Sequence, residues 1–344
     1  MAPYWNQEVL LHDHLAGSFP LVSVLPQLFQ MSGKEFPFNK FNCHLEVKKI
    51  FQNPQIDIVK KFSNITGVMQ SRDTLALAAE ACTRVRARQG FGYCEVTAAP
   101  QYYVFGGLKE EEVIAALVEG IKRGEEQYPE IEVNLLFTVG REVSSEEGIR
   151  LVESAARCDR NYVVGIGLAC DEANHPPQKH IPLFRRAKEL GFKTTVHAGE
   201  WVNDKPNVER DEPLLLQNVL CAIFDLGADR ISHAIPLAYS PDLVKIVVDK
   251  EIGVEGCPGS NLASGLIPNV SYLKIRKLLG AGVLYSLNPD DDLFLPDLNE
   301  TFALCDKEYN FTDDEKRRLK MNAWATRFGR RKSHGISPEV FKRP

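Results

Sequence analysis

Eight short apolar runs recur along the chain, and longer segments with a helical spacing of apolar residues separate them. The runs are rich in β-branched residues, as expected of buried strands. After the first, most of them follow one another at intervals of roughly 30 to 40 residues, the length of one strand-helix unit. The predicted strands are residues 8–14, 93–99, 132–139, 163–169, 193–199, 230–235, 252–258 and 283–289.

Eight strand-helix units with nearly continuous apolar strands predict a closed parallel barrel of the (β/α)8 TIM type, with a doubly wound open sheet as the alternative. Residues 108–128 and 182–192 carry the apolar spacing of helices packed on a sheet. Neither G-x-G-x-x-G nor G-x-x-x-x-G-K-[ST] follows any of the strands. The open sheet therefore lacks its usual phosphate-binding motif, and the barrel is favoured.

We expect one barrel domain over residues 1–344. The interval 15–92 is long for a single unit, so it predicts extra helices inserted after the first strand, over the barrel mouth. Residues 57–69 have a helical pattern, whereas 39–53 are expected to be irregular. A last helix is predicted from Asp313.

The charge balance of 41 basic and 46 acidic side chains gives a net charge of −5. Because binding to a phosphate backbone needs a concentrated basic face, nucleic acid is not an expected partner. No apolar run approaches the roughly 18 residues of a membrane span, and no signal peptide is recognisable. The eight cysteines form no C-x-x-C pair, which favours reduced thiols and a cytoplasmic protein.

Polar side chains stand where several predicted strands end. His12 and His14 lie at the end of the first strand, His197 and Glu200 at the fifth, His233 at the sixth, and the carboxylates of residues 290–292 at the eighth. In a parallel barrel the active site lies at this carboxyl-terminal rim. We therefore interpret these residues as parts of an active site rather than as structural residues.

His12 and His14 are two residues apart on a strand, so both side chains face the barrel interior. An H-x-H pair alone is as often a coincidence as a metal site. His197 and Asp290 at other strand ends favour the metal site. Three nitrogens and one carboxylate oxygen suit zinc and leave room for a water.

The neighbouring residues predict hydrolysis. Zinc lowers the pKa of its water to about 7, His233 and Asp291 can orient and deprotonate that water, and Glu200 can pass a proton to the substrate. Asp290, Asp291 and Asp292 would repel one another without a cation. We expect all three to serve the metal and proton transfer, the alternative being a solvated acidic turn.

Four segments carry a family resemblance: LLHDHLAGS (10–18), TVHAGE (195–200), RISHAI (230–235) and SLNPDDDL (286–293). They resemble the motifs of the adenosine and adenine deaminases, zinc-dependent barrel enzymes that hydrolyse the 6-amino group of purines. VVGIGLACDE (163–172) and VEGCPGSN (254–261) are similar, less distinctively, to two further strand ends of that family.

The resemblance implies a small-molecule purine nucleoside or base as substrate and one Zn²⁺ per chain. Glu200 would protonate ring N1 and His233 would serve as base. Asp291 would accept a hydrogen bond from N7 or its tautomer and help to orient the hydroxide. The implied zinc ligands are His12, His14, His197 and Asp290, and the implied substrate contacts are Asp291, Cys170, Ala16 and Gly17.

Three positions depart from the family pattern. Ala16 stands where adenosine-specific members have aspartate and adenine-specific members often have glutamate. Cys170 replaces a glycine of the family. Pro289 replaces a threonine, and Asp292 follows as a third carboxylate. The alanine cannot hydrogen bond to a ribose through its side chain. It either leaves space for a 5′-extended nucleoside, such as aminodeoxyfutalosine, methylthioadenosine or a nucleotide, or reflects a ribose anchored elsewhere.

Two other classes of protein fit the sequence less well. A two-metal barrel hydrolase would need a lysine where the fourth strand ends in Ala169 and Cys170. A catalytically inactive binding protein would be expected to lack a zinc ligand or Glu200, and none is lost. The H-x-E…P-C-x-x-C signature of polynucleotide deaminases is missing as well.

Overall fold

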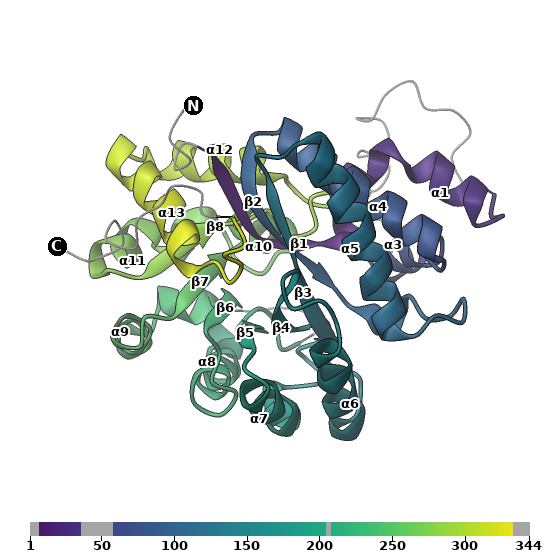
Figure 1. Ribbon diagram of the computed structural model, residues 1–344. Coiled ribbons are helices and arrows are strands. Elements are labelled where there is room, and N and C mark those ends of the chain that lie inside the picture. Colours follow the sequence, from purple (N-terminus) through teal and green to yellow (C-terminus); the bar gives the residue numbers. More distant parts are fainter. Residues whose placement is uncertain (1–6, 36–57, 204–207, 333–344) are drawn as a thin grey trace.

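The computed structural model describes residues 7–35, 58–203 and 208–332. Its centre is an eight-stranded parallel sheet in the order β1 to β8, and helices surround it (Figure 1). The fold is the expected (β/α)8 barrel. The strands are β1 (Glu8–His14), β2 (Phe91–Ala98), β3 (Glu132–Gly140), β4 (Val163–Ala169), β5 (Lys193–Ala198), β6 (Arg230–His233), β7 (Gly253–Gly256) and β8 (Leu284–Leu287).

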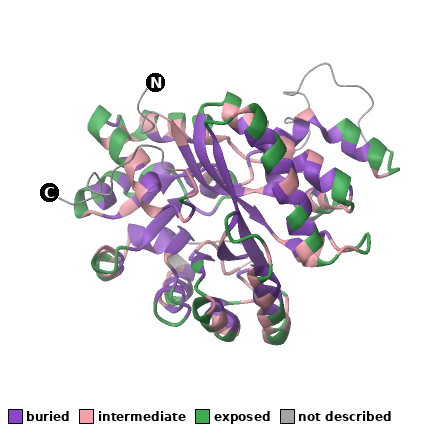
Figure 2. Ribbon diagram, in the orientation of Figure 1, coloured by how far each residue is buried: buried purple, intermediate pink, exposed green. Residues whose placement is uncertain are grey.

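The strands are buried and the outer faces of the helices are exposed (Figure 2). This matches the continuous apolar character of the strands, because a barrel strand packs against side chains inside and helices outside. The helices are α1 (Leu25–Met31), α3 (Ile58–Thr66), α4 (Arg72–Arg88), α5 (Glu110–Gln127), α6 (Ser145–Ala156), α7 (Ile181–Glu189), α8 (Val208–Phe224), α9 (Pro241–Asp249), α10 (Pro258–Ala263), α11 (Ile275–Ala281), α12 (Leu298–Tyr309) and α13 (Asp313–Thr326). None of these described helices is long and apolar enough to cross a membrane.

The interval between β1 and β2 contains α1, α3 and α4. Phe62 of α3 packs edge-on against Phe294, with ring centroids 4.9 Å apart. Phe294 follows the acidic residues after β8, so α3 lies at the carboxyl-terminal rim of the barrel. The irregular stretch expected at 39–53 lies outside the described residues.

The barrel closes differently from the way its other strands pair. Four residue pairs join β7 to β8, from Gly253 with Leu284 to Gly256 with Leu287. In the described part of the chain, β1 meets the segment after β8 through one isolated parallel bridge, Asp13 with Asp290. The Asn288 side chain adds a hydrogen bond from Leu11 N to its Oδ1, at 3.1 Å. Side chains therefore contribute much of this closure.

The segment after α13 covers the opposite end of the barrel. Backbone N–H groups of Arg331 and Lys332 donate to the buried Glu132 carboxylate at 3.1 and 2.8 Å. Phe328 N donates to Glu95 Oε1 at 2.6 Å. These two carboxylates thus anchor residues 328–332 at the end of the barrel opposite the rim that carries the histidines.

Candidate active site

Three histidines and one aspartate converge at the carboxyl-terminal rim. His14 Nε2 lies 3.2 Å from both His12 Nε2 and His197 Nε2. Asp290 Oδ1 lies 3.3 Å from the Nε2 atoms of His12 and His14. The structure thus brings together the four residues expected to bind metal, from β1, β5 and the segment after β8.

These spacings suit a tetrahedral metal ion. Ligands about 2.0 to 2.1 Å from a zinc ion are separated by about 3.3 Å along the edges of the tetrahedron, close to the nitrogen and oxygen separations found here. Three imidazole nitrogens facing one another cannot all be satisfied by hydrogen bonds among themselves, because each pair needs one donor and one acceptor. The donor set therefore fits a divalent cation.

The electrostatics favour a positive charge at this point. Burial lowers the pKa of His12, but the Asp290 and Glu255 carboxylates outweigh this effect and raise it to about 10. Burial, followed by the neighbouring histidines, lowers the pKa of His197 well below its ordinary value. A metal ion would supply the positive charge while keeping every imidazole neutral.

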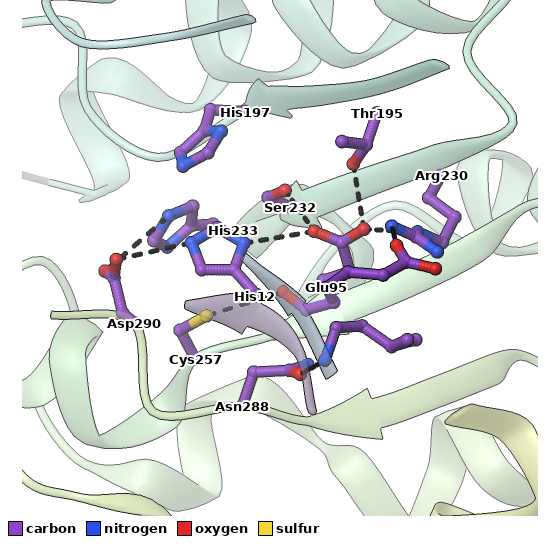
Figure 3. Close-up of polar contacts among 12 residues, drawn as sticks. His12, Glu95, Thr195, His197, Arg230, Ser232, His233, Cys257, Asn288 and Asp290 are labelled. Atoms are coloured by element: carbon purple, nitrogen blue, oxygen red, sulfur yellow. Dashed lines mark hydrogen bonds and ion pairs between the residues drawn. The ribbon is translucent and has the colours of Figure 1, made fainter. Parts of the chain in front are cut away.

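Buried polar groups inside the barrel support His12. Its Nδ1 lies 3.0 Å from Glu255 Oε2, so Nδ1–H donates to the carboxylate and the Nε2 lone pair faces the cluster. Glu255 is held by Thr195 and Ser232 at 2.8 and 2.6 Å, and by Arg230. Figure 3 shows these three partners and His12. Despite its burial, Arg230 and His12 lower the pKa of Glu255 to about 2. The carboxylate therefore stays ionised.

His233 and Glu200 form a second pair next to the cluster. His233 Nδ1 lies 2.9 Å from Asn261 Oδ1 and donates to it, which leaves Nε2 as the basic nitrogen. That Nε2 is buried, has no hydrogen-bond partner among the described residues, and lies 3.5 Å from Glu200 Oε2. Burial raises the pKa of Glu200, and so does the nearby Asp290 carboxylate.

The backbone around Glu200 is fixed by Glu172, which follows β4. The Glu172 carboxylate accepts hydrogen bonds from Gly199 N at 2.9 Å and Glu200 N at 3.0 Å. It also accepts one from Asn218 Nδ2 of α8 at 2.9 Å. Glu200 is thereby held on a defined turn directly beyond β5.

Asp291 faces the turn after β1. Its Oδ1 is buried and has no hydrogen-bond partner in the described part of the chain. A Cβ added at Gly17 would lie 1.8 Å from Asp291 Oδ1, so the glycine makes room for this carboxylate. Burial and the Asp290 charge raise the pKa of Asp291 well above its ordinary value.

Two further predicted residues, Ala16 and Cys170, have clear positions. Ala16 is buried in the short 3-10 helix Leu15–Gly17 that follows β1. Cys170 is exposed just beyond β4, with its Sγ 3.5 Å from Tyr102 Oη. His233, Asp290 and Cys170 have φ angles of +64°, +68° and +80°, in the left-handed region that is costly for residues other than glycine.

The expectation for Asp292 was wrong. Its carboxylate is fully buried and points away from the histidines: Oδ2 accepts from Arg86 Nη1 at 2.8 Å and Oδ1 from Phe19 N at 2.6 Å. The cation that offsets the third carboxylate is thus an arginine of α4. The sequence could not reveal this partner, because Arg86 lies 206 residues away.

Sequence reasoning also missed several supporting residues. Glu255 was visible as a lone charge in an apolar strand, which is a usable signal for an interior polar role. Ser260, whose Oγ donates to Asp290 Oδ2 at 2.7 Å, and Asn261 lie in the recognised segment 254–261 without having been singled out. The Arg141 guanidinium, which donates to the His197 carbonyl, had no such signal.

Comparisons with known proteins agree with this geometry. A family model described as adenosine deaminase matches residues 8–335. The chain is 27% identical over 321 residues to the adenine deaminase of Wolinella succinogenes, covering 92% of this chain and 91% of the relative. It is 30% identical over 286 residues to the adenosine deaminase of Clostridium botulinum, covering 83% and 81%.

Solved structures share the fold at lower identity. An amidohydrolase from Burkholderia ambifaria with bound zinc superposes with a TM-score of 0.80 at 21% identity, covering 98% of this chain and 88% of the other. The N6-methyl-AMP deaminase of Arabidopsis superposes with a TM-score of 0.75 at 21% identity, covering 99% and 97%.

Proposed function

Because the chain belongs to the adenosine deaminase family, and is therefore a hydrolase of carbon–nitrogen bonds in cyclic amidines, we propose that it removes the 6-amino group of an adenosine-type purine with one zinc ion. The observation that carries this proposal is the convergence of His12, His14, His197 and Asp290 beside the Glu200 and His233 pair. The ion, held by those first four residues, would supply a Lewis acid that makes water nucleophilic at neutral pH.

The remaining side chains have complementary proton-transfer roles. His233 Nε2, fixed as an acceptor by the bond from Nδ1–H to Asn261, takes a proton from the attacking water. Glu200, whose raised pKa favours the protonated acid, donates to ring N1 and makes C6 more electrophilic. Asp291, whose raised pKa favours the protonated carboxyl, donates a hydrogen bond to the N7 lone pair. Addition of water and loss of ammonia leave the 6-oxo purine.

The identity of residue 16 bears on the choice of substrate. A buried methyl group there offers no hydrogen bond to a ribose 5′-hydroxyl. This supports a 5′-extended adenosine or a nucleotide as an alternative to adenosine, and free adenine as a further one. Among the similar structures, one from Arabidopsis was solved with GMP and another with IMP.

A substrate panel tests the proposal. The purified protein, with its zinc content measured, is incubated with adenine, adenosine, 5′-deoxy- and 5′-methylthioadenosine, AMP and N6-methyl-AMP. Release of ammonia or methylamine and the ultraviolet change of the purine are then recorded. We expect turnover of at least one 6-aminopurine, and no turnover of any would contradict deamination. If residue 16 faces the ribose terminus, Ala16→Asp should raise the turnover of adenosine relative to the other purines. An unchanged order of turnover among the purines would contradict that placement.

A further inference from the structure

We infer that Arg86 is a positioning residue that clamps the two metal-binding segments together where the barrel closes. The clamp is defined here as Arg86 with the carboxylates of Asp13 and Asp292. The inference rests on the proposed function, because it concerns the geometry of the proposed zinc ligands. It also gives a role to Asp292, which the catalytic cluster does not use.

The two carboxylates of the clamp belong to the same segments as the ligands. Asp13 lies between His12 and His14 and, because side chains alternate along a strand, points to the opposite face of β1. Asp292 lies two residues after Asp290. Both carboxylates are fully buried. Any movement of one clamp carboxylate therefore moves a backbone segment that carries proposed ligands.

Every N–H group of the Arg86 guanidinium has a hydrogen-bond acceptor. Its Nε and Nη2 donate to Asp13 Oδ2 at 3.1 and 2.9 Å, and Nη1 donates to Asp292 Oδ2 at 2.8 Å. The two remaining N–H groups reach Ser18 Oγ and Gln89 Oε1 at 3.2 and 3.0 Å. All five donors of a planar, rigid group are thus directed to fixed acceptors, which a lysine cannot reproduce.

The clamp lies where the backbone pairing is weakest. Asp13 and Asp290 form the one isolated bridge between β1 and the segment after β8 among the residues described, whereas other neighbouring strands share ladders. Two further contacts lie beside it: Leu293 N donates to the Gly17 carbonyl at 2.8 Å, and Phe19 N donates to Asp292. Arg86 thus reinforces the closure that sets the separation of His12 and His14 from Asp290.

The test compares matched Arg→Lys substitutions. Arg86→Lys keeps the positive charge but loses the planar group with its five N–H donors. Arg331→Lys makes the same change in the ion pair of Arg331 with Glu125, at the other end of the barrel. Zinc affinity is measured by chelator competition, geometry by the visible spectrum of the cobalt-substituted protein, and stability by thermal melting without metal. We expect Arg86→Lys to lower zinc affinity about 10- to 100-fold and to change the cobalt spectrum. Arg331→Lys should leave both unchanged.

A second variant keeps the inference falsifiable if Arg86→Lys does not fold. Asp292→Asn retains the volume and an acceptor for Phe19 N but removes the charge facing Arg86, and should shift zinc affinity and spectrum in the same direction. A folded variant with lower thermal stability but wild-type zinc affinity and cobalt spectrum would overturn the clamp. Failure of the wild-type protein to bind zinc would instead overturn the proposed metal site, and the clamp with it.

Discussion

Glu255 Oε2 lies 3.0 Å from His12 Nδ1, on the side of the imidazole that faces away from the histidine cluster. The carboxylate fixes the orientation and tautomer of a proposed zinc ligand, while Arg230 keeps it ionised. Such a partner increases the basicity of the ligating nitrogen. The site therefore depends on charges that lie deeper in the barrel than the ligands.

Replacing Glu255 with glutamine should weaken metal binding. Glutamine retains an acceptor oxygen but not the negative charge, so we expect zinc affinity to fall about 10- to 100-fold, as measured by chelator competition. Glu132→Gln is the control, because Glu132 is equally buried but binds backbone N–H groups at the opposite end of the barrel. Equal zinc affinities for the two variants would contradict this role.

Substitution of Gly17 should reduce turnover through Asp291. A Cβ at residue 17 would lie 1.8 Å from Asp291 Oδ1, so Gly17→Ala must displace that carboxylate. A displacement of about 1 Å can reduce rate about 100-fold, and we expect kcat/KM to fall by that order while zinc content stays unchanged. Gly280→Ala is the control, because an added Cβ meets no atom within 4 Å there. Wild-type kcat/KM in Gly17→Ala would exclude this steric constraint.

Much of the fold could be predicted because barrel strands are short, apolar and regularly spaced. The predicted strands 8–14 and 163–169 have the observed bounds of β1 and β4. The predictions for the sixth to eighth strands ran too long, for example 252–258 against Gly253–Gly256. The apolar character continues past the last ladder bond there, because residues just beyond the strands, such as Ala234 and Cys257, are also buried.

The proposed ligands could be identified because they stand at strand ends, whereas their supporting contacts could not. Asp13 lies between two such residues and Asp292 lies two positions after another. Their common partner Arg86 is nevertheless distant in sequence and lies in a helix with many charged residues. Only the folded arrangement of α4 against the β1 and β8 ends brings them together. Long-range pairing of this kind leaves no local sequence pattern.

Acid should destabilise the fold partly through His180. This imidazole is buried and its Nε2–H donates to the Arg141 carbonyl at 3.1 Å. Burial, followed by the charges of Arg141 and Lys179, lowers its pKa from 6.5 to about 3. Below pH 6.5 the unfolded chain binds a proton that the folded protein excludes, so stability falls as the pH drops from 6.5 towards 3.

The measurement is urea denaturation of the metal-free protein at pH 7 and pH 5. We expect the wild-type protein to lose about 2 kcal/mol more stability between these pH values than His180→Gln. Glutamine can still donate to the Arg141 carbonyl but does not titrate. His175→Gln is the control, since His175 is a neighbouring histidine that is only partly buried. Equal pH dependence of the wild-type protein and His180→Gln would refute the assignment.

Glu200→Gln should separate proton donation from metal binding. Glu200 Oε2 lies 3.5 Å from His233 Nε2, outside the proposed ligand set, and its backbone is held by Glu172. An amide retains the size of the side chain but is not a useful acid, so we expect kcat to fall about 100- to 10,000-fold with one zinc ion per chain retained. His12→Ala, by contrast, should lose zinc. Zinc content by atomic absorption and turnover of the accepted purine distinguish the two variants. Wild-type turnover in Glu200→Gln would show that the proton reaches the ring from another group.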